Sequence, residues 1–197
     1  MSENERLLVK HSKSGDIESF EILIASYEKK AYNIALRIMG NEEDAKDMTQ
    51  EALVRIYKSI SNFKEQSAFS TWMYRIVTNV CLDEIRKRKN GRAISIDGGL
   101  ETEDGEIKLE LRSDEATPEE QYQRKEDKQV ILNAINELTE EYKSVIVLRD
   151  VQGFSYEEIS GILSCSIGTV KSRINRARNL LKDKLKTRLE LSKAYNV

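Results

Sequence analysis

Apolar and polar residues follow a helical period near the end of the chain, over residues 154–185. The apolar face of a first short helix consists of Ile159, Ile162 and Leu163. Ser155, followed three residues later by Glu158, forms the pattern of a capping box, in which each side chain bonds the other residue's backbone N–H. The run Ser164–Ser166 interrupts the period and predicts a turn.

A second helix is predicted from about Gly168, where the apolar period resumes. Its apolar stripe consists of Val170, Ile174, Ala177, Leu181 and Leu185. At about 100° per residue, the remaining surface of this helix is cationic and rich in amides. These polar residues are Lys171, Ser172, Asn175, Arg176, Asn179 and Lys182, with Arg173 and Arg178 beside the stripe. Arg and Lys donate to guanine and Asn pairs with adenine, so the pattern favours a DNA-reading helix-turn-helix.

A solvated basic face on an ordinary bundle helix is the alternative explanation. Residues 171–188 contain eight Lys or Arg and one Asp. Like charges repel one another unless a polyanion neutralises them, so this imbalance favours DNA binding.

The first 91 residues read as helices throughout. One helix is predicted between Asp16 as its cap and Gly40 as its end, because apolar residues from Phe20 to Ile38 keep a helical spacing. Asn41 then caps a helix whose first turn is acidic, an arrangement that the helix dipole favours.

The helix after Asn41 has an unusual outer side. Its buried stripe consists of Ala45, Met48, Ala52 and Ile56, and its outer side carries Asp47, Gln50 and Val54, flanked by Asp44, Glu51 and Lys58. A valine among carboxylates suits a protein–protein contact, and it equally suits a solvated face with one stray apolar residue.

Residues 63–89 combine aromatic and basic side chains. A polar loop between Phe63 and Phe69 precedes a helix that Ser70 or Thr71 can cap. The inward residues of that helix are Met73, Tyr74, Val77, Val80 and Cys81, and the outward ones are Arg75, Asn79 and Arg86, with Trp72 and Asp83 alongside. Rings stack on exposed bases and cations follow a phosphate backbone, so this block suits a single strand. Alternatively, the aromatic residues are simply core.

Composition divides the chain into two predicted domains. Residues 97–120 contain ten acidic and two basic residues with little periodicity, which is typical of a linker. We therefore predict a first domain over residues 1–91, a linker over 92–122 and a second domain over 123–197. Thr117-Pro118, a cap and a first helical position near the end of this linker, leads into the second domain. There one helix is lined by Ile131, Ala134, Ile135 and Leu138, and Thr139 caps another.

The whole composition predicts an all-α protein of two small helical domains. Charged residues are 34% of the 197 and there is one Pro. Cys81 and Cys165 are too few for a disulfide framework and are expected to be reduced. The longest aliphatic run, Val145–Leu148, is far too short to span a membrane, so we expect a cytoplasmic protein without membrane insertion.

The sequence predicts no enzyme site, metal site or cofactor. His11 is the single histidine, and no spacing of cysteine, histidine or carboxylate suits zinc. Neither GxxxxGK[ST] nor GxGxxG is present. A catalytic site needs a nucleophile or a base with an orienting partner, and none is visible.

Three stretches together resemble the extracytoplasmic-function sigma factors, the small two-domain sigma factors of bacterial RNA polymerase. They are NEEDAKDMTQEAL (41–53), FSTWMYRIVTNVCLDEIRK (69–87) and YEEISGILSCSIGTVKSRINRAR (156–178). Their order and spacing make the resemblance specific, and it covers nearly everything except the predicted linker.

The resemblance implies a role for each domain. Core RNA polymerase would be contacted by Asp44, Asp47, Gln50 and Glu51. The minus-10 element of promoter DNA would lie near Lys64, Ser67, Ala68, Arg75, Asn79 and Asp83. In the second domain, the minus-35 bases would be read by Lys171, Ser172, Asn175 and Arg176, and its phosphates would be braced by Arg149, Thr169 and Arg178. The family also implies an anti-sigma factor as a partner.

Two serines depart from the family's usual turn. Ser164 stands where such units often have Gly, and Ser166 where the family often has Pro. A serine in place of glycine is expected to accept a less favourable backbone conformation. Asn175 stands where relatives often carry an aromatic residue, so no relative's promoter sequence transfers to this chain.

Two other functions compete with a sigma factor. A free-standing helix-turn-helix regulator would bind duplex DNA without polymerase, usually as a dimer on paired half-sites. It would leave the aromatic and basic block at 63–89 and the acidic face at 44–58 without a role. A helical adaptor that binds no nucleic acid would leave the basic helix unexplained.

Overall fold

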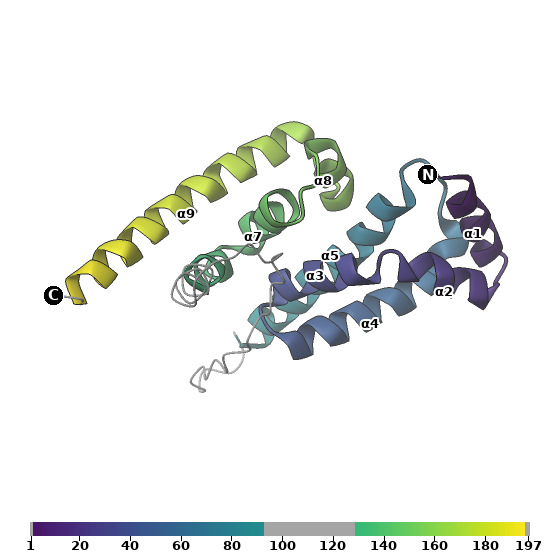
Figure 1. Ribbon diagram of the computed structural model, residues 1–197, viewed down its shortest axis with the longest axis horizontal. Helices are drawn as coiled ribbons and strands as arrows, with labels where there is room; N and C mark the ends of the chain where they lie inside the picture. The colour runs from purple at the N-terminus through teal and green to yellow at the C-terminus, as the bar shows by residue number, and fades with distance from the viewer. Residues whose placement is uncertain (1, 93–128, 196–197) are drawn as a thin grey trace, which may run out of the picture.

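The computed structural model describes residues 2–92 and 129–195, and it describes side chains over residues 2–89 and 129–186. Within these residues every regular element is helical, which confirms the all-α fold class (Figure 1). The first-domain elements are α1 (Glu3–Lys13), α2 (Ile17–Ala25), α3 (Glu28–Met39), α4 (Glu42–Ser59), the 3-10 turn η1 (Ile60–Asn62) and α5 (Phe69–Arg92). The second-domain elements are a helical segment over 129–136, α7 (Glu140–Ile146), the π-helical turn η2 (Val147–Val151), α8 (Tyr156–Leu163) and α9 (Ile167–Tyr195).

The helices α1 to α5 form one bundle, in which α5 packs on both α3 and α4. Capping residues define several ends as predicted. The Asp16 carboxylate accepts hydrogen bonds from the N–H groups of Glu18 and Ser19, and Asn41 caps α4. Gly40 ends α3 with a φ of 91°, a left-handed conformation that glycine adopts without strain.

Three sequence expectations about helices are wrong in detail. The single helix expected between Asp16 and Gly40 is two helices, because the chain turns at residues 26–27 and resumes in the same apolar phase. The helix α5 begins at Phe69, so Ser70 and Thr71 lie inside it and neither is its cap. Ile131 is 46% exposed and Leu132 is buried in its place.

In the second domain, α8 and α9 join through a turn and α9 packs along α7. The predicted apolar faces are buried at Ile159, Ile162, Val170, Ile174 and Ala177. Thr139 occupies the N-cap position of α7, but its side chain makes no capping bond there.

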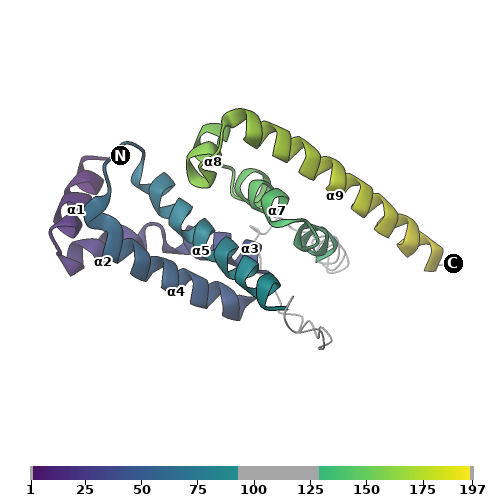
Figure 2. The same ribbon diagram turned by 180° about the vertical axis from the view of Figure 1, so that it is seen from behind.

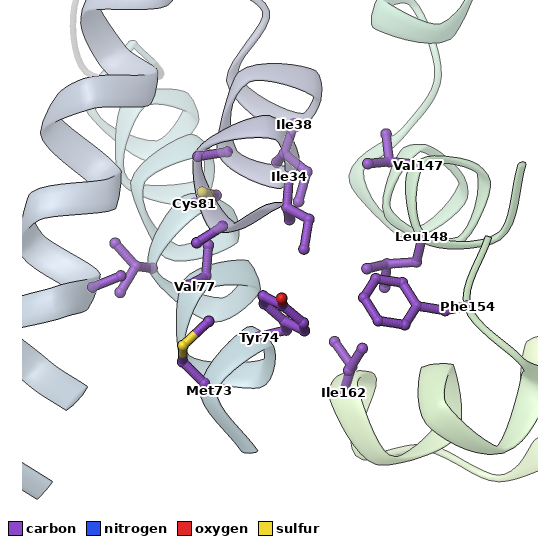
Figure 3. Close-up of a cluster of buried hydrophobic side chains, with 14 of the residues drawn as sticks. Ile34, Ile38, Met73, Tyr74, Val77, Cys81, Val147, Leu148, Phe154 and Ile162 are labelled. Atoms are coloured by element: carbon purple, nitrogen blue, oxygen red, sulfur yellow. The ribbon is translucent and has the colours of Figure 1, made fainter. Parts of the chain in front are cut away.

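The two domains touch through a shared apolar core, here called the interdomain seam. Its first-domain side is Ile34, Tyr74 and Val77, and its second-domain side is Leu148, Phe154 and Ile162 (Figure 3). The Tyr74 and Phe154 rings meet edge to face with centroids 5.4 Å apart. The Lys30 ammonium lies 3.9 Å from the centroid of the Phe154 ring. The sequence did not predict how the two domains are arranged, and in the structure they pack against each other.

The helices α5 and α8 form the closest part of this contact, and Figure 2 shows them from behind. A Cβ atom at Gly161 would come within 2.8 Å of Cγ2 of Thr71. Glu140 on α7 pairs with Arg86 and Lys89 on α5, which adds ionic contacts between the domains. Apart from Arg92, which ends α5, the predicted linker lies outside the described residues, as does Thr117-Pro118.

Candidate nucleic-acid and polymerase interfaces

Serines cap the start of α8 and form the turn between α8 and α9. Ser155 and Glu158 form the predicted capping box, with Ser155 N–H donating to Glu158 Oε2 at 2.8 Å. Ser164 ends α8 with a φ of 51°, the left-handed conformation that costs a residue with a Cβ atom. Two residues later, the Ser166 hydroxyl accepts a hydrogen bond from Thr169 N–H at 3.1 Å and so caps α9.

This turn leaves one side of α9 facing solvent. The buried stripe of α9 anchors the helix to its domain, and the opposite residues are exposed: Lys171, Ser172, Asn175, Arg176 and Arg178. Thr169 is half-buried and hydrogen-bonded to Ser166. The arrangement can present cations and an amide to the edges of bases, while their role in reading DNA stays a prediction.

Two of the residues predicted to brace phosphates are already engaged. Arg149 Nη1 donates to the Phe154 carbonyl at 2.7 Å, and its guanidinium lies over the Tyr156 ring at 4.9 Å. Arg178 forms two hydrogen bonds with the carboxylate of Asp150. The sequence could not reveal these pairs, because their members lie on different elements.

A groove runs between α4 and α5 on the first domain. Its volume is about 610 Å³, and its lining is net acidic, with Asp47, Glu51, Asp83 and Glu84 against Arg55 and Lys87, together with Gln50, Met48, Val54 and Val80. Of its apolar lining, sequence reasoning identified only Val54. Met48 and Val80 were assigned to the buried stripes, and only packing of the two helices shows that they also face the groove.

Asp44 lies at the N-terminal end of this groove's helix and is tied to α5. Both of its oxygens accept hydrogen bonds from Arg88, at 2.5 and 2.6 Å, and Asn41 donates to it at 2.7 Å. The bond from Arg88 is the main cause of a pKa for Asp44 below its ordinary value. Asp44 is thus an anchor between α4 and α5 as well as a candidate contact residue.

The residues predicted to lie near the minus-10 element do not form one cluster. Lys64, Ser67 and Ala68 are exposed on the loop before α5, Arg75 is half-buried and Asn79 is exposed on α5. Asp83 instead lines the acidic groove with Asp47. Phe63, Phe69 and Trp72 pack on one another with centroid distances of 5.1 to 5.7 Å, which favours their alternative role as core.

Neither a metal site nor a membrane-spanning helix is found in the described part of the chain. Over residues 2–89 and 129–186, no group of three or more His, Cys, Asp or Glu side chains is arranged to hold a metal ion. No helix in the described part of the chain has the length and apolarity to cross a membrane.

Comparison with protein families assigns both domains. Residues 23–91 match the model of Sigma-70 region 2, and residues 128–181 match that of Sigma-70 region 4. The chain belongs to the ECF sigma factors. An ECF sigma-E factor of Haemophilus influenzae is 33% identical over 92% of this chain and 95% of its own length. SigW of Bacillus subtilis, also an ECF sigma factor, is 35% identical over 90% of this chain and 95% of its own.

Solved structures agree with this assignment of an ECF sigma factor. RpoE of Bartonella quintana, solved in complex with the anti-sigma factor NepR, superposes with a TM-score of 0.68 at 27% identity. The match covers 86% of this chain and 98% of RpoE. CnrH shares the fold with a TM-score of 0.64. The resemblance predicted from the three sequence stretches is confirmed, and it favours a sigma factor over a free-standing regulator.

Proposed function

We propose that this ECF sigma factor binds bacterial core RNA polymerase through its first domain and directs it to promoter DNA. The observation that carries the proposal is that two surfaces of opposite charge lie on separate domains. The net-acidic groove between α4 and α5 suits a protein partner, because charged and apolar side chains line it together. The basic side of α9 suits a polyanion.

The polymerase contact is proposed at Asp47, Gln50 and Glu51, with Asp44 at one end of the groove. We add Asp83 to this surface, because it lines the groove beside Asp47. Near the minus-10 element we retain Lys64, Ser67, Ala68, Arg75 and Asn79. The minus-35 element is assigned to the exposed residues of α9.

The spacing of the two promoter elements bears on how the domains are arranged during initiation. Two elements about 17 base pairs apart lie roughly 58 Å apart, at 3.4 Å per step. The interdomain seam, by contrast, holds α5 and α8 in direct contact. A linker over residues 92–122 extends up to about 100 Å, at roughly 3.3 Å per residue, which is ample for this span. We therefore propose domains at 1–91 and 123–197 that part during initiation.

An anti-sigma factor is a proposed partner as well. The support is the likeness to RpoE, which was solved with the anti-sigma factor NepR. We propose no catalytic activity, because the supporting relatives are sigma factors, and we place the protein in the cytoplasm with the polymerase.

Binding to core RNA polymerase tests the proposal directly. Asp47→Arg reverses a charge in the acidic groove, and Arg176→Ala removes a cation from the exposed side of α9. We expect Asp47→Arg to weaken polymerase binding at least tenfold and Arg176→Ala to leave it unchanged. The same Arg176→Ala chain, bound to polymerase, should lose promoter affinity by about 1–3 kcal/mol.

The wild-type result decides between the two candidate functions. No measurable affinity of the wild-type chain for core polymerase contradicts a sigma factor. Tight, polymerase-independent binding to paired half-sites would then support a free-standing regulator.

A further inference from the structure

Asp150 and Arg178 form an ion pair that bridges two elements of the second domain. Asp150 is in η2, and Arg178 is three turns into α9. Arg178 Nη2 donates to Asp150 Oδ1 at 2.5 Å, and Arg178 Nε donates to Oδ2 at 3.1 Å. The guanidinium therefore grips the carboxylate with two parallel hydrogen bonds, the strongest arrangement that these groups adopt.

This grip occupies the edge of the guanidinium formed by Nε and Nη2. A guanidinium carries five N–H donors, and a carboxylate and a phosphate can each accept two parallel hydrogen bonds from one of its edges. The side chains remain 50% and 34% exposed, so solvent reaches the pair and its partners can exchange. While the pair is intact, Asp150 occupies one edge of the guanidinium and balances its charge, so a phosphate at the remaining edge gains little from Arg178 until the pair breaks.

The neighbouring cations of α9 show how selective this arrangement is. Arg173 pairs with Glu141 at 3.2 Å and Lys184 pairs with Glu137 at 2.7 Å, both on the side of α9 that packs toward α7. Arg176, on the exposed side, has no carboxylate partner among the described residues. Of the proposed DNA-contact cations, Arg178 is the one that pairs with an acid among the described residues.

We propose that Asp150 limits the affinity of the free chain for duplex DNA by competing with phosphate for Arg178. The inference rests on the proposed function, and it names how the DNA-binding surface is regulated. Affinity for any duplex depends on the number of phosphates that cations neutralise. An acid that occupies one cation and repels the backbone therefore weakens binding wherever polymerase does not hold the domain on DNA.

The experiment measures binding of the full chain to a random-sequence duplex of about 30 base pairs by fluorescence anisotropy. Asp150→Asn keeps the shape of the side chain and removes its charge. We expect it to tighten binding about fivefold at roughly 0.1 M salt and to steepen the dependence of log K on log salt by about one. Glu157→Gln is the matched control, because it removes one negative charge from an exposed position of α8.

A double-mutant cycle with Arg178→Gln distinguishes competition for Arg178 from a general effect of removing one negative charge. In an Arg178→Gln background, Asp150→Asn should give less than a twofold gain, because no guanidinium remains to be released. An undiminished gain in that background would overturn the proposal, and so would a gain from Glu157→Gln equal to that from Asp150→Asn. Weaker binding by Asp150→Asn together with a lower Tm would show that Asp150 is a structural brace, which also overturns it.

The proposed function fails on different data. It fails if the wild-type chain does not bind core polymerase, a measurement in which Asp150 takes no part. Competition by Asp150 is measured by the ratio of the duplex affinities of the Asp150→Asn and wild-type chains. That ratio does not depend on whether the chain binds polymerase.

Discussion

Ser164 and Ser166 lie two residues apart in the turn before α9, yet they serve opposite purposes. Ser164 is held in the left-handed region at a φ of 51°, where a Cβ atom is strained. Ser166 has the favourable task of accepting the Thr169 N–H. We expect Ser164→Gly to raise the free energy of unfolding by up to about 1 kcal/mol, because glycine adopts this conformation without strain.

The matched substitution is Ser166→Ala, which removes the capping hydroxyl. It should lower the free energy of unfolding by about 1 kcal/mol. Urea denaturation followed by circular dichroism measures both changes. Equal signs for the two substitutions would contradict the assigned roles.

Lys143 is a buried cation on α7 that faces the first domain. It is 7% exposed, and burial lowers its pKa from an ordinary 10.5 to about 8. The groups of α5 that act on it are Cys81 and Lys89, and Glu140 on its own helix is paired with Lys89. Below pH 8 the ammonium is charged in both folded and unfolded chains, so the folded chain bears the full penalty of burying it.

We expect Lys143→Met to stabilise the fold at pH 7 by up to about 3 kcal/mol, because methionine fills the space without a charge. As pH rises from 8 to about 10.5, wild-type Lys143 loses its proton first in the folded chain, so the advantage of Lys143→Met should shrink. The check is the difference in unfolding free energy between variant and wild type across this range. Burial raises the pKa of Cys81 to about 12, which destabilises the fold above pH 9. Because the Lys143 charge also acts on this thiol, both chains are compared in a Cys81→Ala background.

At the scale of elements, Arg88 joins the start of α4 to the end of α5. It donates to Asp44 on α4 and, at 2.8 Å, to Glu84 on its own helix. We expect Arg88→Met to lower the free energy of unfolding by about 1 kcal/mol at pH 7, a modest value because Arg88 is partly exposed.

The pH dependence distinguishes this ion pair from simple packing. The pKa of Asp44 is below its ordinary value, so the stability it adds is present above that value and is lost as pH falls through the folded pKa. The difference between Arg88→Met and wild type should therefore shrink below about pH 4. Lys46→Met, an exposed change on α4, is the control and should have little effect at either pH.

Sequence patterns predicted elements better than their junctions. The capping box at Ser155 and the stripe of α9 follow from local spacing alone, and both are present. The sequence did not indicate the break between α2 and α3, because Tyr27 continues the helical spacing of apolar residues across it. The partners of Arg149 and Arg178 were invisible for another reason: pairing across elements depends on tertiary packing, which one helix's pattern does not contain.

At the scale of the whole molecule, the interdomain seam joins the two domains through a shared apolar core. At Gly161 an added side chain would press on this contact, because a Cβ there meets Cγ2 of Thr71 at 2.8 Å. We expect Gly161→Val to part the domains while leaving each folded. Small-angle X-ray scattering should show a larger radius of gyration, with helical circular dichroism unchanged within a few per cent.

Gly168→Val is the control, because its nearest neighbour, Ser166 Oγ, lies at an ordinary 3.7 Å. It introduces the same β-branched residue into a helix without touching the first domain. An equal expansion by both variants would mean that the valine perturbs its own helix, and not the contact between domains.

The aromatic pair Tyr74 and Phe154 is covered only while the domains touch. The fraction of chains whose domains are separated, and can therefore act at a promoter, is then also the fraction that exposes this apolar surface and accessible backbone. When opening is fast compared with cleavage, the rate of degradation follows that open fraction. A chain with closed domains should therefore be degraded slowly, and a chain with open domains that is not bound to polymerase should be degraded quickly. The interdomain contact would then set both the transcription that this sigma factor directs and its half-life.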